Sequence, residues 1–407
     1  MLVTGDQQLL RQINRMVLVR KLLSESELSR ADLAEAVGLT KSTVSLLVRE
    51  LVEEGWFSES ELVVTGSLGR RPTPLHIDGA RLALLGADLG IDEIRIVATN
   101  LLGEVLEHHV VPYENVNNVS ACLKLLAKAM VRVARKLITQ QRTILGIGVG
   151  MHGGVDESAG VLHFAPNLGW KNVNAAEQLR NHFLATPLAD LPLFVQNEAD
   201  VAALAEFEFS AQSGADPLIY LSIGYGVGAG VVVRDSLLTG YRGFAGEVGH
   251  TILQANGPLC SCGRRGCAEA VIGLGNLLGK VGKSMPERRQ ALQTLFEQVQ
   301  SGVASRTAAV EVAGRNLGVL LNNLWVAFDP MRIVLGGPAM QLGDAFLSPA
   351  LAVLKEYSTV AQLPAPLIQT TGYGEDAVAI GAAALVRYHL TRPLTYQNQP
   401  STGTRHD

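Results

Sequence analysis

Cysteine is concentrated in one short segment of the chain. The segment reads Cys260-Ser-Cys-Gly-Arg-Arg-Gly-Cys267 and holds three of the four cysteines, while Cys122 lies far upstream in an apolar run. One histidine with three cysteines forms a closed tetrahedral ligand set for zinc, with no position left for a catalytic water. His250, Cys260, Cys262 and Cys267 would form this set. The alternatives are free structural cysteines or a disulfide, although Cys-x-Cys spacing is too tight for an easy disulfide.

The size and composition are those of a globular protein with more than one domain. The chain has 407 residues, of which 47% are hydrophobic and 18% are charged. Its 42 glycines suggest tight turns and close backbone approaches, as in α/β folds with ligand loops. A net charge of −4 gives no general sign of nucleic-acid binding, so a DNA-binding surface would have to be local.

No targeting segment is evident. The N-terminus lacks the charged and apolar regions of a signal peptide. The longest apolar run, 218–233, is short and broken by glycines, so it is predicted to form buried strands and not a membrane span. We therefore expect a cytoplasmic protein without membrane insertion, in which disulfides are disfavoured.

The first 78 residues show the pattern of a helix-turn-helix. Apolar residues recur at helical spacing from Leu33 to Leu51, and Gly38 interrupts them where one helix should end. Thr40 is a suitable N-cap for the second helix. Small polar and basic residues remain near the start of this helix, the end that meets base edges and phosphates in such motifs. The predicted DNA contacts on this helix are Lys41, Ser42, Thr43, Ser45 and Arg49.

A hairpin wing is predicted after the second helix. Residues 61–77 contain two β-like runs around a glycine-rich turn, and Arg70-Arg71-Pro72 leaves this wing in an extended form. An extended arginine pair suits a narrow minor groove, so Arg70 and Arg71 are also predicted DNA contacts. The alternative is a polar helical hairpin with a linker, which charge alone would favour. The agreement of turn, cap and arginine pair favours DNA binding.

The remainder of the chain has the pattern of an α/β protein. Residues 82–106 are predicted to form strands around a glycine turn, and 218–240 begins in the same way, with Asp88 and Ser222 at matching places. This similarity indicates a duplicated β-hairpin. Further strands are predicted at 144–156 and 332–344, and an alanine-rich helix at 375–388.

Several motifs occur in one order along the chain. They are the helix-turn-helix, Arg-Arg-Pro, NEAD (197–200), GFAGEVGH (243–250), CSCGRRGCAE (260–269) and IVLGG (333–337). In this combination nearly the whole chain resembles the ROK family (repressors, open reading frames, kinases). Within the family it is similar to the repressors NagC, Mlc and the xylose repressor, which carry the DNA-binding module that the kinases lack.

The resemblance implies a fold class and a set of domains. We expect an α/β protein with a winged helix-turn-helix at 1–78 and a two-lobed, actin-like, sugar-kinase-type body. The first lobe would span 79–195 and be completed by a C-terminal helix at 375–390. The second lobe, 196–374, would hold the zinc site and an oligomerisation surface. Residues 391–407 would form a loose tail.

The resemblance also implies two sites. In the family the counterparts of the His250 and cysteine set bind structural zinc. A sugar pocket would be lined by Asn197, Glu198, Glu247, His250 and Glu269. His250 would then serve both sites, with one ring nitrogen for each. Asp200 stands where related kinases often have Asn.

The phosphate loops depart from the kinase pattern. ROK kinases carry Asp-x-Gly-Gly-Thr-Lys, whereas this chain has Asp88-Leu-Gly90-Ile91-Asp92-Glu93. Ile91 blocks close backbone approach, and Asp92 and Glu93 place negative charge where phosphates should lie.

Two further kinase features are altered. The second loop, usually Gly-Thr-Gly, has Tyr225 at its centre. Glu198 replaces the Asp of Asn-Asp-Ala-Asn, so the position of the catalytic base is degenerate and misplaced by one methylene. We predict that kinase activity is lost and that the chain has no catalytic residue. The alternative is an active ATP-dependent ROK sugar kinase with an added DNA-binding module.

We therefore expect a transcriptional repressor of carbohydrate-metabolism genes, released from operator DNA by a monosaccharide. Similarity to xylose-type repressors makes xylose the first expected effector and glucose the second. The expected partners are operator DNA, the sugar and further copies of the chain in a homodimer or homotetramer. A protein partner is a third route of control. Structural zinc is the expected cofactor.

Overall fold

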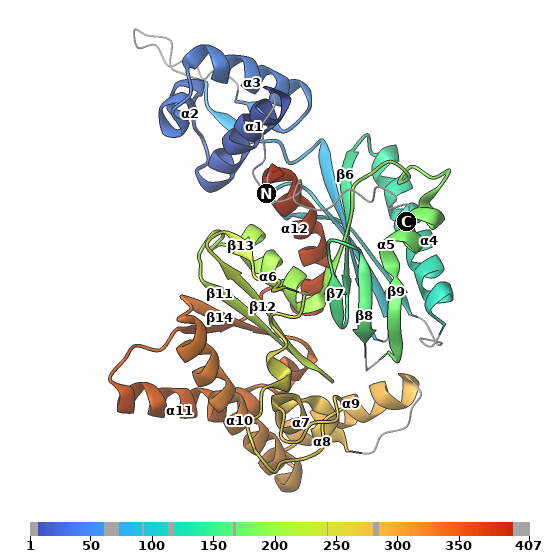
Figure 1. Cartoon of the computed structure of the whole chain (residues 1–407), viewed down its shortest axis with the longest axis vertical. Coiled ribbons are helices and arrows are strands. Elements are labelled where there is room, and N and C mark those ends of the chain that lie inside the picture. The colour runs from blue at the N-terminus through green and yellow to red at the C-terminus, as the bar shows by residue number, and fades with distance from the viewer. Residues whose placement is uncertain are drawn as a thin grey trace, which may run out of the picture.

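The fold consists of a helical N-terminal unit and a larger α/β body (Figure 1). The structure is a computed structural model and describes residues 7–60, 73–91, 93–112, 118–165, 168–241, 243–279 and 285–393. The body contains two five-stranded sheets and a smaller three-stranded one. In Figure 1 the red helix α12 (Ala377–Thr391) lies between the two larger sheets, below the N-terminal unit.

The N-terminal unit contains the predicted helix-turn-helix. Its elements are α1 (Gln7–Ser24), α2 (Arg30–Val37), α3 (Lys41–Glu53), β1 (Phe57–Glu59) and β2 (Leu75–Ile77). Ser29 and Asp32 form a capping box at the start of α2, and Gly38 ends that helix with a left-handed φ of 69°. Thr40 caps α3 by accepting a hydrogen bond from the Thr43 amide. The predicted helix end and helix start are both confirmed.

The described part of the wing is its base. Strands β1 and β2 pair in antiparallel fashion, with Phe57 opposite Ile77. The segment 61–72 between them lies outside the described residues, and so do Arg70 and Arg71. Their predicted minor-groove contact therefore stays a prediction.

The first sheet of the body has the strand order β10-β6-β3-β4-β5. Its strands are β3 (Leu82–Leu89), β4 (Glu93–Thr99), β5 (Val105–Pro112), β6 (Thr143–Met151) and β10 (Leu193–Asn197). Alternate side chains of β3 pack on α4 (Val119–Thr139) and on α12, so this strand is buried along its whole length. A smaller antiparallel sheet follows in the chain. It contains β7 (Gly154–Asp156), β8 (Val161–Ala165) and β9 (Trp170–Asn174), and leads into α5 (Ala175–Phe183).

The second sheet of the body has the strand order β13-β12-β11-β14-β15. Its strands are β11 (Leu218–Ile223), β12 (Val227–Val233), β13 (Ser236–Leu237), β14 (Arg332–Gly336) and β15 (Leu367–Thr370). The helices and 3-10 turns of this half are η1 (Val248–His250), α7 (Ala268–Ile272), α8 (Leu274–Leu278), α9 (Met285–Gln300), α10 (Ala304–Phe328), η2 (Pro338–Leu342), α11 (Asp344–Ala361) and η3 (Gly374–Asp376).

The two sheets agree with the predicted duplication. In each, a central strand pairs antiparallel with the next strand of its hairpin and parallel with a later strand. Asp88 lies opposite Gly150 on the parallel neighbour in the first sheet, and Ser222 lies opposite Gly336 in the second. The matching places inferred from the sequence are therefore equivalent positions in the two hairpins.

Close backbone contacts join the sheets through α6 (Glu198–Phe209) and α12. A Cβ on Gly381 of α12 would lie 1.9 Å from the Val201 carbonyl oxygen of α6. A Cβ on Gly148 of β6 would lie 1.8 Å from the α12 backbone, and one on Gly230 of β12 would lie 2.3 Å from the α6 backbone. Only glycine permits such approaches. Each helix is therefore fixed to one sheet, and the two helices form the joint between the sheets.

The N-terminal unit packs on the first sheet and on α12. Leu18 and Leu22 of α1 belong to one apolar cluster with Leu84 and Leu101 of the body. The Arg81 guanidinium, just before β3, donates hydrogen bonds of 3.1 and 2.9 Å to main-chain oxygens at the end of α3. Among the described residues, no helix is both long enough and apolar enough to cross a membrane.

Candidate functional site

A cavity of about 1090 Å³ lies between the two sheets. Its lining comes from the ends of β3, β6, β10 and β11, from the start of α12, and from α9. The predicted sugar-binding residues all line it, namely Asn197, Glu198, Glu247, His250 and Glu269. This volume can hold a monosaccharide with room to spare.

Asn197 orients its neighbours at the floor of the cavity, by which we mean the part of the lining formed by Asp88, His152, Asn197 and Glu198. Its side-chain oxygen accepts hydrogen bonds from the Ala199 and Asp200 amides and so caps α6. Its side-chain nitrogen donates to the Gly153 carbonyl at 2.8 Å and to Glu198 Oε2 at 2.7 Å. The cap fixes the start of α6, and the amide orients the Glu198 carboxylate.

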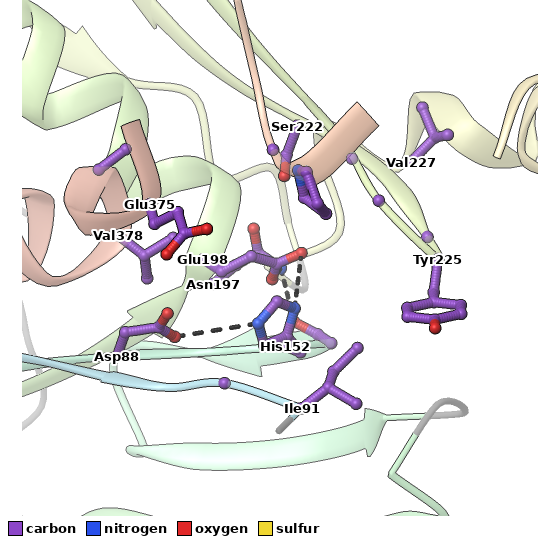
Figure 2. A pocket seen from close by; sticks show the side chains of 18 of the residues that line it. Asp88, Ile91, His152, Asn197, Glu198, Ser222, Tyr225, Val227, Glu375 and Val378 are labelled. Atoms are coloured by element: carbon purple, nitrogen blue, oxygen red, sulfur yellow. Dashed lines mark hydrogen bonds and ion pairs between the residues drawn. The ribbon is translucent and has the colours of Figure 1, made fainter. Parts of the chain in front are cut away.

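His152 is a cavity residue that the sequence analysis did not identify. Figure 2 shows its ring between two carboxylates: Nδ1 lies 3.5 Å from Glu198 Oε1 and Nε2 lies 3.9 Å from Asp88 Oδ1. A signal was present in the sequence, because His152 directly follows the buried strand β6, and the ends of parallel strands are where ligand groups collect.

Several carboxyl groups are crowded around this floor. Burial raises the pKa of Asp88 to about 6, against the lowering effect of His152 and together with repulsion from Glu198. Burial and the carboxylates of Glu157 and Glu198 place the pKa of Asp200 well above its usual range. Burial, followed by repulsion from Glu198, raises the pKa of Glu247. The floor is therefore rich in hydrogen-bond acceptors and short of compensating positive charge.

His250 connects the cavity with the cysteine cluster. Its Nε2 faces the cavity, 3.8 Å from Glu247 Oε2, whereas its Nδ1 lies 3.7 Å from Cys260 Sγ. The Sγ atoms of Cys262 and Cys267 lie 3.6 Å apart, and the four donor atoms lie within 4.8 Å of one another. This cluster can hold a metal ion, and the two ring nitrogens of His250 face the cluster and Glu247 separately.

The cysteine loop also reaches Glu269 on the cavity wall. Ser261 Oγ donates a 2.8 Å hydrogen bond to Glu269 Oε1, and the same oxygen lies 3.5 Å from Cys260 Sγ. Glu269 lies in the first turn of α7, two residues after Cys267. A metal ion in the cluster would therefore fix both Glu269 and the 3-10 turn that carries His250.

The first predicted phosphate loop is a tight turn between β3 and β4. The Gly90 amide donates to the Glu93 carbonyl at 3.1 Å, and Ile91 packs against the core of the first sheet. Glu93 lies 2.5 Å from Arg95 and 3.6 Å from Arg289 of α9, so its charge is compensated. The repulsion that we expected from Glu93 is correspondingly reduced. Asp92 lies outside the described residues.

The second predicted phosphate loop carries a large side chain, that of Tyr225, at its centre. Gly224 donates to Gly226 across the turn between β11 and β12, and Tyr225 projects into the cavity (Figure 2). The Tyr225 hydroxyl donates a 3.4 Å hydrogen bond to the Arg288 carbonyl of α9, and the Arg288 guanidinium lies 5.7 Å from the ring centre. Tyr225 is thereby held across the space between the loop and α9.

The predicted DNA-contacting side chains of α3 lie at the surface of the N-terminal unit. Lys41, Ser42, Ser45 and Arg49 are exposed, and Thr43 is half-buried. The opposite face of α3 buries Val44, Leu47, Val48 and Leu51. The helix thus separates an apolar face from a polar one, as a recognition helix requires.

Two families of known proteins match the chain. Residues 84–389 match the ROK family, and residues 11–57 match the winged helix-turn-helix DNA-binding family. The chain is similar to the xylose repressor of Caldicellulosiruptor bescii, with 32% identity over 395 residues that cover 94% of this chain and 97% of the relative. It is also similar to a glucokinase of Halalkalibacterium halodurans, with 26% identity over 317 residues. These residues cover 74% of this chain and 94% of the glucokinase.

A solved structure has the same overall fold. It is a ROK family transcriptional regulator, a homologue of the Escherichia coli MLC protein, and superposes with a TM-score of 0.75. Its identity is 21%, over 96% of this chain and 100% of that one, so the likeness concerns the fold alone.

Asp88 makes the stability of the protein depend on pH. Its pKa is 3.8 without the protein environment and about 6 in the fold, so the folded state binds the proton more tightly. Stability from this group is therefore fully present below pH ~4 and is lost as the pH rises through ~6. We expect Asp88→Asn to raise the free energy of unfolding by on the order of 2 kcal/mol at pH ~7.5 and by much less at pH ~4. Urea unfolding at both pH values tests this, and a pH-independent difference would contradict it.

Proposed function

The chain belongs to the ROK family, and from this premise we propose that it is a repressor that binds operator DNA and releases it when a monosaccharide enters the cavity. One observation carries the proposal. A recognition helix with an exposed polar face and a cavity lined by sugar-type acceptors lie in one chain, and the helix unit packs directly on the body that forms the cavity.

The chemistry of the cavity supports an uncharged sugar as the effector. Glu198, Glu247 and Glu269 offer pairs of acceptor oxygens for neighbouring hydroxyls, and His152 and His250 can donate hydrogen bonds. The same carboxylates would repel a sugar phosphate. We propose xylose as the first candidate and glucose as the second, and the name of the Caldicellulosiruptor relative supports this order.

We propose that kinase activity has been lost. Ile91 stands in place of the second glycine of the first phosphate loop, and Tyr225 projects into the cavity from the second. Glu198 stands at the position of the base with its carboxylate facing His152. The alternative, an active sugar kinase with an added DNA-binding unit, is favoured by the similarity to a glucokinase over 74% of the chain. A repressor that must leave its operator while sugar is present stays in the sugar-bound state longer if it does not convert the sugar.

We propose that the metal of the cysteine cluster is a structural zinc ion. Three thiolates and one imidazole are the soft donors that zinc prefers, and tetrahedral ligands about 2.3 Å from zinc lie roughly 3.7 Å apart. The 3.6 and 3.7 Å separations in the cluster fit this geometry. With all four positions taken by protein, zinc would brace the cavity wall and activate no water.

The remaining parts of the proposal concern organisation. We propose domains at 1–78, 79–195 with the C-terminal helix, and 196–374. The start expected for the loose tail, residue 391, is wrong, because α12 extends to Thr391 and Arg392 is ion-paired with Glu208 and Asp235. We further propose a cytoplasmic homodimer or homotetramer with two-fold symmetry to match DNA half-sites. Exposed apolar side chains on α10 and α11, such as Val312, Val326 and Val360, support an oligomerisation surface in the second lobe. Control by a protein partner is a further route.

Glu247→Gln tests the sugar site. The variant keeps the side-chain shape but removes a charged acceptor, which costs about 1.5–3 kcal/mol of sugar binding. We expect DNA affinity within about twofold of the wild type and a rise of roughly tenfold or more in the sugar concentration needed for release. Fluorescence anisotropy of labelled operator DNA titrated with D-xylose measures both quantities. Glu356→Gln, at an exposed position on α11, is the control. Release of Glu247→Gln at the wild-type sugar concentration would refute the site.

ATP turnover tests the loss of kinase activity. With ATP, Mg²⁺ and D-xylose or D-glucose, we expect ADP formation by the wild type to equal that of Glu198→Gln, because both phosphate loops differ from the kinase pattern. A coupled ADP assay on both proteins measures this. Sustained sugar-dependent turnover that Glu198→Gln abolishes would establish the kinase alternative.

Zinc analysis tests the metal centre. We expect about one zinc per chain in the purified protein, because the donor set is complete. Cys262→Ser should lose the metal and several kcal/mol of unfolding free energy, since structural zinc contributes to folding directly. Cys122→Ser, which changes the buried cysteine on α4, should keep the metal. Mass spectrometry for zinc and thermal unfolding give the two readouts, and a zinc-free wild type of equal stability would exclude the centre.

A further inference from the structure

A chain of ion pairs connects the N-terminal unit to both sheets of the body. Arg20 of α1 pairs with Asp235, which lies in the turn between β12 and β13. Asp235 also accepts a 2.6 Å hydrogen bond from Arg392. Arg392 lies 2.8 Å from Glu208 near the end of α6, and Glu208 accepts a 2.8 Å hydrogen bond from Arg387 of α12. We refer to these five residues as the ion-pair chain.

The ion-pair chain lies at the opposite ends of the two helices that begin at the cavity. Glu198 at the start of α6 and Val378 at the start of α12 both line the cavity. Near the other ends of the same helices stand Glu208 and Arg387. The helices α6 and α12 are in backbone contact at Gly381. A displacement at the cavity would therefore move both helices together, because close-packed elements transmit strain.

The two ends of the Arg20–Asp235 pair are fixed to different halves of the protein. Arg20 belongs to α1, which packs on α12, the helix in backbone contact with β6 of the first sheet. Asp235 belongs to the hairpin of the second sheet. A change in the angle between the sheets therefore changes the distance between these two side chains.

The backbone around Asp235 holds its carboxylate in place. Arg234 and Asp235 have φ values of 53° and 61°, the left-handed pair of a two-residue hairpin turn. The Asp235 amide donates a 2.8 Å hydrogen bond to Asp216 Oδ2. Although burial raises the pKa of Asp235, Arg392 and Arg20 lower it overall, so the group is charged at neutral pH.

Exposure shows which part of the ion-pair chain can separate. The side chains of Arg392 and Glu208 are 9% and 6% exposed, whereas those of Arg20 and Asp235 are 42% and 38% exposed. Breaking the buried pair would leave unpaired charges without water. The Arg20–Asp235 pair can open into solvent at little cost, so it is the part that can differ between two states of the protein.

We propose that Asp235 is a positioning residue that couples the angle between the two sheets to the orientation of the DNA-binding unit, through its ion pair with Arg20. The proposal rests on the proposed function, because the movement it transmits is the one caused by the sugar. In one state of the cavity the pair holds α1, and with it α3, in a single orientation. In the other state the pair is broken and that restraint is lost.

The test measures a coupling factor, defined as the Kd for operator DNA with saturating sugar divided by the Kd without it. We expect Arg20→Gln and Asp235→Asn each to lower this factor by about twofold to fivefold, the size that an exposed ion pair allows. The double variant should fall no further than Asp235→Asn alone, because Arg20 acts through a contact that Asp235→Asn has already removed. Arg20→Lys should keep most of the coupling. D-xylose is the probe, with D-glucose used if xylose does not release the wild type.

Two controls separate coupling from damage. Arg30→Gln removes an ion pair of similar exposure within the DNA-binding unit, Arg30–Glu59, and should leave the coupling factor unchanged. In Arg20→Gln, the thermal midpoint should stay near the wild-type value. The sugar affinity measured without DNA should change by no more than about fivefold, because the pair favours only one of the two states.

The outcomes distinguish this proposal from the function on which it rests. If the wild type responds to sugar and Arg20→Gln responds equally, the coupling role is refuted while the repressor function stands. Additive effects in the double variant would also refute it, because the two residues would then act separately. If neither sugar changes the DNA affinity of the wild type, the proposed function fails and the coupling role fails with it.

Discussion

Backbone contact between α6 and α12 is the constraint on which the other features of this protein depend. Gly381, Gly148 and Gly230 allow the two helices to lie against each other and against their sheets with no side chain between. Packing this close leaves a small number of discrete arrangements for the two halves. Because both helices begin at the cavity, a ligand that prefers one arrangement can choose between them. The N-terminal unit rests on one half and touches the other, so it is placed to respond.

The cavity combines acidic hydrogen-bond acceptors with phosphate loops that differ from the kinase pattern. Asp88, Glu198 and Glu247 line the cavity, and burial raises the pKa of Asp88 and of Glu247. A neutral sugar would satisfy these acceptors with its hydroxyl groups, so binding relieves part of the cost of burying them. At the first loop a phosphate would meet the Glu93–Arg289 pair, and at the second it would meet the Tyr225 side chain.

Local patterns could be predicted from the sequence, and long-range pairs could not. Gly38 and Thr40 mark helix ends through their own backbone preferences, and the matching hairpins of Asp88 and Ser222 follow from repeated strand and turn patterns. The four side chains of the cysteine cluster with His250 lie close together in the sequence, so the cluster could be predicted from their spacing. By contrast, Arg289 reaches Glu93 from almost two hundred residues away, and Arg20 reaches Asp235 over a similar separation. Only the packing of the two halves brings such residues together.

The central claim is that sugar occupancy of the cavity controls DNA binding, and one titration tests it directly. Full-length protein at fixed salt would be bound to labelled DNA from upstream of its own gene, and neutral and phosphorylated monosaccharides would be added while anisotropy is followed. We expect tight binding that one neutral sugar reverses and that its phosphate ester does not. Tight binding that no sugar disturbs, or no specific DNA binding at all, would contradict it.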